Sequence, residues 1–234
     1  ESANLAELVV DFESFLLEHQ LGGQVQLQGN QATFSLIGKA AHGSTPSKGV
    51  NAATFLAKYL HRFEFDQAGA ESFLHLLADH LHLDFEGVNL GVAHRDPVMQ
   101  ELTMNVGLVN YQDDKGGSVV ANFRYPKGTD PEKMAAQTAQ RLAGHDLSVE
   151  WGEFKEPHYV SVDDPMVKEL LAVYEEQTGL EGHEMTIGGG TYGRLMPRGV
   201  AYGALFPDSI DTMHQANEFI AIDDLLKATA IYAE

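Results

Sequence analysis

Residues that could carry out chemistry lie mainly in polar loops, and His214 is the clearest case. It sits in the polar segment 206–218, between an apolar run and a helix that begins with acidic residues. Functional residues concentrate on such loops, which a rigid scaffold holds in place. A single histidine does not make a metal site, because catalytic zinc needs about three protein ligands. If His214 binds a metal, its partner ligands must lie elsewhere in this chain or outside it.

A glycine-rich loop, Gly188-Gly189-Gly190-Thr191, lies at a predicted strand-to-helix turn. Bare backbone N–H groups near the start of a helix can bind an anion. The loop lacks the Lys-Ser/Thr pair of a P-loop, and its spacing differs from the dinucleotide-binding fingerprint. A tight turn without a ligand is the alternative interpretation, and phosphate or nucleotide binding is disfavoured.

His42 occupies a third loop, residues 41–46 (Ala-His-Gly-Ser-Thr-Pro), which follows a predicted strand and precedes a predicted helix. An imidazole at a loop edge can donate a hydrogen bond to an oxyanion. The alternative, which the bare sequence favours, is a turn whose histidine caps the next helix. Either interpretation places His42 at the junction of two elements.

Arg124 ends a predicted strand and stands between Phe123 and Tyr125. An arginine at the end of a strand is usually a solvated or ion-paired surface group. The sharper hypothesis is a bidentate clamp for a carboxylate, because the planar guanidinium suits that geometry better than a lysine does.

Two other patterns imitate catalytic sites. His82-Leu83-Asp84 resembles a histidine–carboxylate metal pair but ends an amphipathic helix, and Glu175-Glu176 lies in the middle of a helix. We interpret both as solvated surface. The remaining histidines, His61 and His75 among them, show no helical pairing with metal-ligand spacing. No Gly-x-Ser-x-Gly nucleophile elbow occurs.

The elements that position these loops can be predicted from hydrophobic periodicity. A helical stripe at 5–19 is followed by a β-hairpin, because residues 24–28 alternate strictly and Gly29-Asn30 supplies a turn. From strand 31–38 onward, the order strand, helix, strand, strand, helix, strand is that of the ferredoxin-like βαββαβ fold, with one helix inserted. The later predicted elements are helix 50–63, inserted helix 67–81, strands 102–111 and 118–125, helix 131–143 and strand 145–154.

Residues 156–234 form a second predicted unit that looks incomplete. It holds helix 165–177, strands 182–187 and 199–206, and a final helix, whereas an α/β layer needs more strands to cover both faces. We therefore predict an α+β chain with a ferredoxin-like domain at 1–155 and an incomplete α/β segment at 156–234. The chain begins inside a helical pattern without an initiator Met, which is typical of a fragment. Unpaired edges of the two strands predict self-association.

Composition excludes several classes of function. The net charge of −19 repels nucleic-acid backbones and anionic membranes, so neither is an expected partner. No apolar run approaches the roughly 20 residues that span a bilayer, and no signal peptide opens the chain. The absence of cysteine excludes disulfides, thiolate catalysis and cysteine zinc sites, and it is compatible with a cytoplasmic location.

Four separated stretches together resemble one family. Residues 35–46, which end in Ala-His-Gly-Ser-Thr-Pro, resemble the start of the lid domain in the aminoacylase and carboxypeptidase superfamily of dizinc metallopeptidases. Residues 103–107 (Thr-Met-Asn-Val-Gly) resemble a strand of that lid. Residues 186–193 and 208–218 resemble the PepV-type dipeptidases of the superfamily. The similarity covers essentially the whole chain, and it implies a lid domain followed by the last part of a catalytic domain.

The resemblance also implies roles for single residues. Arg124 matches the lid arginine that binds the C-terminal carboxylate of a dipeptide. The loop that helps to hold the same carboxylate matches Gly189, Gly190 and Thr191. Asn105 is left out of this set, because ordering of the lid sheet is an alternative role for it.

For the catalytic step, the resemblance makes His42 the lid histidine that stabilises the oxyanion, and His214 the last zinc ligand. The family's N-terminal half carries the other metal ligands and the glutamate base, and it has no counterpart here. The implied activity of the intact protein is hydrolysis of unblocked dipeptides by a water that two zinc ions activate. We expect the chain to be inactive without that missing N-terminal half. The alternative is a non-catalytic ligand-binding or dimerisation module, which needs neither metal nor His42.

Overall fold

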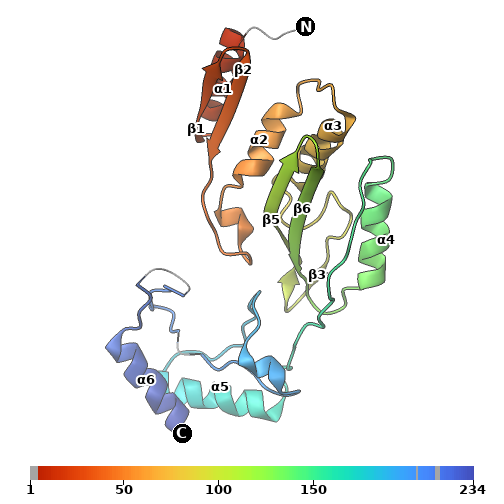
Figure 1. Ribbon diagram of the computed structural model, residues 1–234. Helices are drawn as coiled ribbons and strands as arrows, with labels where there is room; N and C mark the ends of the chain where they lie inside the picture. The colour runs from red at the N-terminus through yellow and green to blue at the C-terminus, as the bar shows by residue number, and fades with distance from the viewer. Residues whose placement is uncertain (1–4, 204, 214–216) are drawn as a thin grey trace. The chain divides into compact units, whose positions relative to one another are not determined.

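The computed structural model describes residues 5–203, 205–213 and 217–234, which belong to two compact units, Glu1–Pro157 and His158–Glu234 (Figure 1). The protein is of the mixed α+β class, and the strands within the described ranges pair only as two-stranded antiparallel sheets. In the same ranges, no helix combines the length and the apolar character that crossing a membrane requires.

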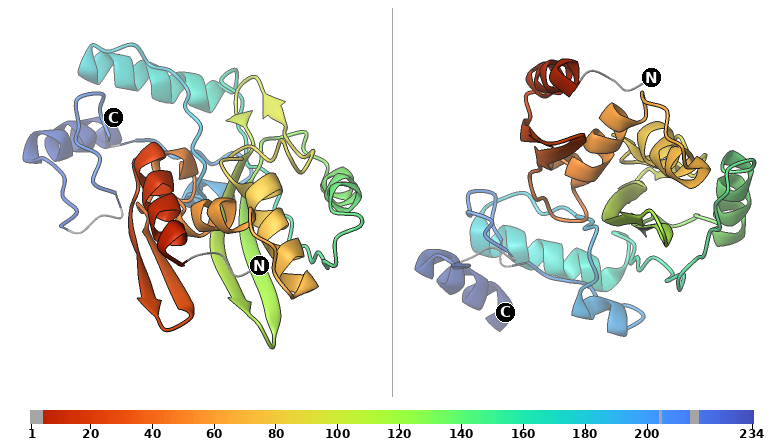
Figure 2. Two further views of the ribbon diagram at one scale, coloured as in Figure 1. Left: turned by 90° about the horizontal axis from the view of Figure 1, so that it is seen from above. Right: turned by 45° about the horizontal axis from the view of Figure 1, so that its top comes forward.

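The first unit begins with a helix packed on a hairpin. Helix α1 (Leu5–Glu18) lies along strands β1 (Gly22–Gln28) and β2 (Gln31–Ile37), as Figure 2 shows. The hairpin turn contains Gly29 with a φ of 60°, a conformation that glycine adopts without steric cost. The buried aromatic rings of α1 pack with those of the next helix, α2 (Ala52–Leu60), and these rings form the first hydrophobic core. The predicted helix 5–19 and hairpin are confirmed.

Helix α2 (Ala52–Leu60) connects this core to the next sheet. Its N-cap is Asn51, whose Oδ1 accepts hydrogen bonds from the backbone N–H groups of Ala53 and Thr54. The Nδ2 of the same Asn51 donates to the carbonyl of Val106, 2.9 Å away on β5. The start of α2 is therefore fixed against β5 by one side chain.

The predicted inserted helix 67–81 is present, and its second half is π-helical instead of α-helical. Helix α3 (Ala68–His75) continues into η2 (Leu76–Leu81), a π-helical turn. Its residues Leu77, Ala78 and Leu81 are buried, and Leu77 and Leu81 belong to the second core. Such π-turns are rare and often accompany functional positions. Two short strands, β3 (Arg95–Asp96) and β4 (Gln100–Glu101), pair with each other next in the chain.

The central hairpin is formed by strands β5 (Thr103–Gln112) and β6 (Gly116–Arg124), with a register shift between Val106 and Leu108. Successive side chains of a strand point to opposite faces. Met104, Val106, Ala121 and Phe123 alternate onto the face that belongs to the second core. Helix α4 (Pro131–Arg141) contributes to the same core and lies on the side of β5–β6 away from the β1–β2 hairpin (Figure 2).

The predicted strand 145–154 is wrong: these residues form no ladder. They instead contact β6 and the residue after it through aromatic rings. Trp151 lies 5.6 Å from Phe123, and Phe154 stacks on Tyr125 with ring centroids 4.4 Å apart. Ring contacts replace backbone pairing here, so the four-stranded sheet that the ferredoxin-like prediction requires is not seen among the described residues.

The second unit is built from two helices and connecting segments. Helices α5 (Pro165–Thr178) and α6 (Ile222–Ala233) contribute to a small core with Phe206, and η3 (Tyr192–Leu195) is a short 3₁₀ turn. The predicted strands 182–187 and 199–206 are absent from their described residues. Alternation alone does not form a strand, because each strand needs a neighbour to satisfy its backbone groups. The strand edges proposed as a cause of self-association are therefore missing, and self-association itself stays a prediction.

Candidate substrate-binding site

The β5–β6 hairpin presents a polar face opposite its apolar one. Thr103 pairs with Arg124 and Asn105 pairs with Asn122, and residues that pair directly across two strands share a face. This face therefore carries a guanidinium, two amides and a hydroxyl in a single patch. Arg124 is half-buried at the end of β6, so its charge is partly desolvated and interacts more strongly with an anion than a fully solvated charge does.

The His42 turn lies against this polar face. A Cβ atom added to Gly43 would lie 3.4 Å from Arg124 Nη2 and 3.6 Å from Asn105 Nδ2. An antiparallel bridge between Lys39 and Val50 closes the loop that contains the turn. The structure therefore brings together two segments that the sequence places far apart, and both carry residues selected from the sequence.

Asn105 is the residue of this group that the sequence analysis left out. The alternation of side chains along a strand could have identified it. Asn105 lies two residues after Thr103, the partner of Arg124 on β5, and therefore on the same face of the strand. Its amide Nδ2 faces Gly43 in the structure. An amide can donate to the carboxylate or carbonyl oxygens of a ligand that Arg124 holds.

The hydrogen bonds of His42 define its tautomer. Its Nδ1 lies 2.7 Å from Ser44 Oγ and 3.3 Å from the backbone nitrogen of Ser44. A backbone N–H can only donate, so Nδ1 is the acceptor and the ring proton of a neutral imidazole resides on Nε2. The side chain is exposed and is not a helix cap, because α2 is capped by Asn51. The helix-cap interpretation of His42 is therefore wrong, and its ring is arranged to donate through Nε2.

The glycine-rich loop of the second unit is described separately. Gly189 and Gly190 are exposed, and a Cβ atom on Gly190 would lie 3.3 Å from Arg194 Nη1. Thr191 precedes η3 without a side-chain cap hydrogen bond. Neither the strand before this loop nor an α-helix after it is present, so the predicted strand-to-helix turn is wrong. A substrate role for Gly189, Gly190 and Thr191 stays a prediction.

His214 lies outside the described residues. Of the residues around it, Thr212 Oγ1 donates to the carbonyl of Phe219 and accepts from the Phe219 backbone N–H, both at 3.1 Å. The proposed metal-ligand role of His214 therefore stays a prediction.

The structure places the two patterns that resemble catalytic sites, Glu175-Glu176 and His82-Leu83-Asp84, in different environments. Glu175 and Glu176 are exposed on α5, as expected. Asp84 is instead only 8% exposed, and its carboxylate accepts hydrogen bonds from the backbone N–H groups of Glu86, Val88 and Asn89. His82 is half-buried beside the ring of Phe55. The interpretation of these two residues as solvated surface is wrong, since Asp84 is buried and His82 is half-buried.

His82 makes stability depend on pH. Burial, followed by the charges of Lys58 and His19, lowers the pKa of His82 to about 4 from 6.5. The unfolded chain therefore binds the proton first, so stability is complete above pH 6.5 and is lost as the pH falls toward 4. Between pH 7 and pH 5 we expect a loss of roughly 1–2 kcal/mol, allowing for the half-exposed ring.

Urea unfolding of the wild-type chain and of His82→Gln at several pH values measures this effect. The variant should lose less stability on acidification, and His183→Gln, which alters an exposed histidine, is the matched control. Equal pH slopes for the wild type and His82→Gln would contradict the assignment.

One further group was missed by the sequence analysis. His61, His75 and Asp79 come together with all ligand atoms within 4.8 Å of one another, and no other such group of histidine and acidic residues occurs in the described part of the chain. The statement that the histidines show no helical pairing with metal-ligand spacing is therefore wrong for His75, which lies four residues before Asp79. The group lies at the C-terminal end of α2, about 13 Å along the helix from the end that follows the His42 loop.

Comparison with known proteins identifies the family. Residues 22–234 match the peptidase family M20/M25/M40, and the chain belongs to this family of metal-dependent peptidases. The resemblance to dipeptidases of this type is thereby confirmed.

Relatives with dipeptidase names are similar along the chain. It is 46% identical over 232 residues to the "Beta-Ala-Xaa dipeptidase" of Lactobacillus delbrueckii subsp. lactis. It is 36% and 37% identical over 231 residues to proteins named "Putative dipeptidase" in Staphylococcus haemolyticus and Staphylococcus saprophyticus. Each match covers 99% of this chain and 49% of the relative, so the chain spans about half the length of the curated relatives it matches.

Proposed function

We propose that the intact protein is a metal-dependent dipeptidase and that residues 1–155 are its lid domain. Residues 156–234 are then the last part of its catalytic domain. The observation that carries the proposal is the meeting of the His42–Gly43 turn with Arg124 and Asn105 on one polar face. Membership of the family and the names of the relatives supply the reaction class.

In this proposal Arg124 binds the C-terminal carboxylate of the dipeptide. The guanidinium forms two parallel hydrogen bonds to a carboxylate, which fixes the position of that group as well as its charge. The amide of Asn105 is placed to donate to the same ligand. Gly189, Gly190 and Thr191 are proposed to assist from the second unit. Binding at the terminal carboxylate selects unblocked substrates of a defined length.

His42 is proposed to donate its Nε2 proton as a hydrogen bond to the carbonyl oxygen of the scissile peptide. Charge develops on that oxygen in the transition state, so a donor aimed at it lowers the barrier more than it strengthens substrate binding. The contact between Nδ1 and Ser44 keeps the imidazole in the tautomer that this role requires.

The described residues do not fit the metal centre of the family. Among the described residues, the single cluster with metal-ligand spacing is His61, His75 and Asp79. It lies at the end of α2 opposite to the end that follows the His42 loop. We propose that His214 is one metal ligand and that the other ligands, the glutamate base and the second zinc ion of the intact enzyme depend on the part of the protein outside this chain.

The proposal is tested by assaying dipeptide hydrolysis with the 234-residue chain and with the full-length gene product. The full-length protein should be active and should lose activity on treatment with a chelator. The isolated chain should be inactive, because it lacks the proposed base and most metal ligands. Hydrolysis by the isolated chain would contradict the division of the site, and an inactive, metal-independent full-length protein would favour the binding-module alternative.

A further inference from the structure

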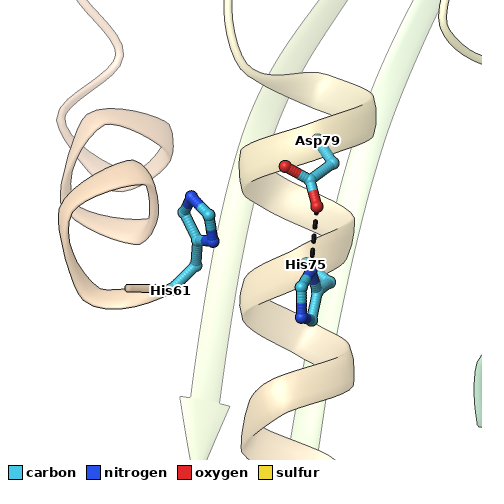
Figure 3. Close-up of side chains that lie close together, drawn as sticks. All are labelled: His61, His75 and Asp79. Carbon is cyan, nitrogen blue, oxygen red and sulfur yellow. Dashed lines mark hydrogen bonds and ion pairs between the residues drawn. The ribbon is translucent and has the colours of Figure 1, made fainter. Parts of the chain in front are cut away.

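A second group of potential metal ligands lies on the surface of the first unit. His61 is the C-cap residue of α2, His75 is the last residue of α3, and Asp79 lies in η2 (Figure 3). Positions four apart on a helix share one face, so His75 and Asp79 project together. His61 joins them from the neighbouring helix. The two helices thus contribute three ligand atoms that lie within 4.8 Å of one another.

The three side chains already interact. His75 Nδ1 lies 2.8 Å from Asp79 Oδ2, and the rings of His61 and His75 are 5.8 Å apart between centroids. Partial burial opposes ionisation of Asp79, yet the hydrogen bond from His75 and the charges of His61, His75 and Lys58 lower its pKa overall. Asp79 is therefore an anion at neutral pH, beside two imidazoles.

The cluster is both accessible and well supported. The side chains of His75 and Asp79 are 49% and 44% exposed, so an ion can reach them from solvent. The η2 turn, which carries Asp79, is held in place by its own buried residues Leu77, Ala78 and Leu81. Ligands on a fixed backbone lose less conformational entropy when they bind an ion.

We propose that His61, His75 and Asp79 bind a divalent transition-metal ion of the zinc, cobalt or nickel class, which links α2 to α3–η2. Imidazole and carboxylate are ligands that these ions accept, and water completes the coordination.

The distances are compatible with such an ion. Tetrahedral zinc, with bonds of about 2.0–2.1 Å, places its ligand atoms about 3.3 Å apart. The His75–Asp79 pair must separate slightly from 2.8 Å, and His61 must approach from within 4.8 Å. Side-chain rotation of the exposed His75 and Asp79 and of the half-buried His61 would be needed for both changes. Binding at His75 Nδ1 requires that this nitrogen carry no proton, and a neutral imidazole meets this requirement in the tautomer whose proton is on Nε2.

Lys58 provides a second, independent test. Its Nζ lies 3.8 Å from Asp79 Oδ1, on the same carboxylate that would bind the ion. A nearby cation opposes binding of a second cation. Replacing Lys58 by methionine keeps most of the side-chain volume and removes this charge, so the variant should bind the ion more tightly. A cluster that only stabilises the fold would not respond in this way.

The experiment is a titration of the 234-residue chain with zinc and cobalt at pH 7.5, in competition with a chromophoric chelator. His61→Gln, His75→Gln and Asp79→Asn should each weaken binding roughly tenfold or more, and Lys58→Met should strengthen it severalfold. His80→Gln, on the same turn, and His214→Gln are matched controls that should leave this affinity unchanged. Circular dichroism checks that each variant is folded.

The same variants in the full-length protein connect the site to the intact molecule. Metal content after dialysis should fall by one equivalent in His75→Gln, while dipeptidase activity is retained. Absence of saturable binding to the chain would overturn the proposal, as would binding that only His214→Gln removes. Loss of activity in Arg124 variants of the full-length protein bears on the proposed function alone, so the two proposals can fail separately.

Discussion

Replacing Arg124 by alanine in the full-length protein should raise KM for unblocked dipeptides about 100-fold, because two charge-assisted hydrogen bonds contribute roughly 3 kcal/mol together. Arg124 is half-buried at the end of β6; it lies close to Gly43 and on the same face of the hairpin as Asn105. A lysine at this position supplies the charge without the planar fork, so Arg124→Lys should recover only part of the affinity.

The measurement compares kcat and KM for free dipeptides with those for C-terminally amidated ones. Wild-type enzyme should discriminate strongly between the two, and Arg124→Ala should remove most of this discrimination. Arg95→Ala is the matched control, because Arg95 forms an exposed ion pair with Glu101 on the neighbouring short strands. If free and amidated dipeptides are discriminated by Arg124→Ala as they are by the wild type, the carboxylate assignment is wrong.

Replacing His42 by alanine should mainly lower kcat, by a factor of about 100 to 1,000, as the loss of one oxyanion donor does in other hydrolases. KM should change little, because the hydrogen bond becomes strong only as charge develops on the oxygen. Because the side chain of His42 is exposed, the replacement should leave the fold intact, and a thermal melt checks this point.

Ser44→Ala is an informative companion to the His42 variant. It removes the hydroxyl that lies 2.7 Å from His42 Nδ1 but leaves the backbone N–H of residue 44 in place. The tautomer is then still supported, so kcat should fall by less than about tenfold. A Ser44→Ala loss as large as that of His42→Ala would contradict the expectation that the backbone N–H alone is enough to maintain the tautomer.

Much of the first unit could be predicted from the sequence, because its signals are local. The apolar stripe of α1, the alternation of β1 and β2, and the Asp130-Pro131 start of α4 each depend on a few neighbouring residues. His42 and Arg124 could be selected from motifs that resemble a family. Their meeting at Gly43 could not be derived from periodicity, since it depends on how two hairpins and a helix pack.

The failures also have physical causes. Residues 145–154 alternate like a strand, yet Trp151 and Phe154 find aromatic partners instead of a sheet edge. The cluster of His61, His75 and Asp79 was missed for a related reason. The sequence shows only the four-residue spacing between His75 and Asp79. The third residue, His61, comes from another helix, and the sequence does not show which helices pack together.

The two faces of the β5–β6 hairpin have a consequence for how this protein can vary. Odd positions of β5 carry Thr103 and Asn105, while even positions carry Met104 and Val106 into the apolar interior. In the part of the ribbon between Arg124 and the register shift at Val106/Leu108, slipping the pairing by a single residue would exchange these roles. Insertion or deletion of one amino acid before Arg124 should therefore damage folding and ligand recognition together, whereas a two-residue change could spare the alternation. Natural length differences in this ribbon should consequently gather at its tip, near 112–116.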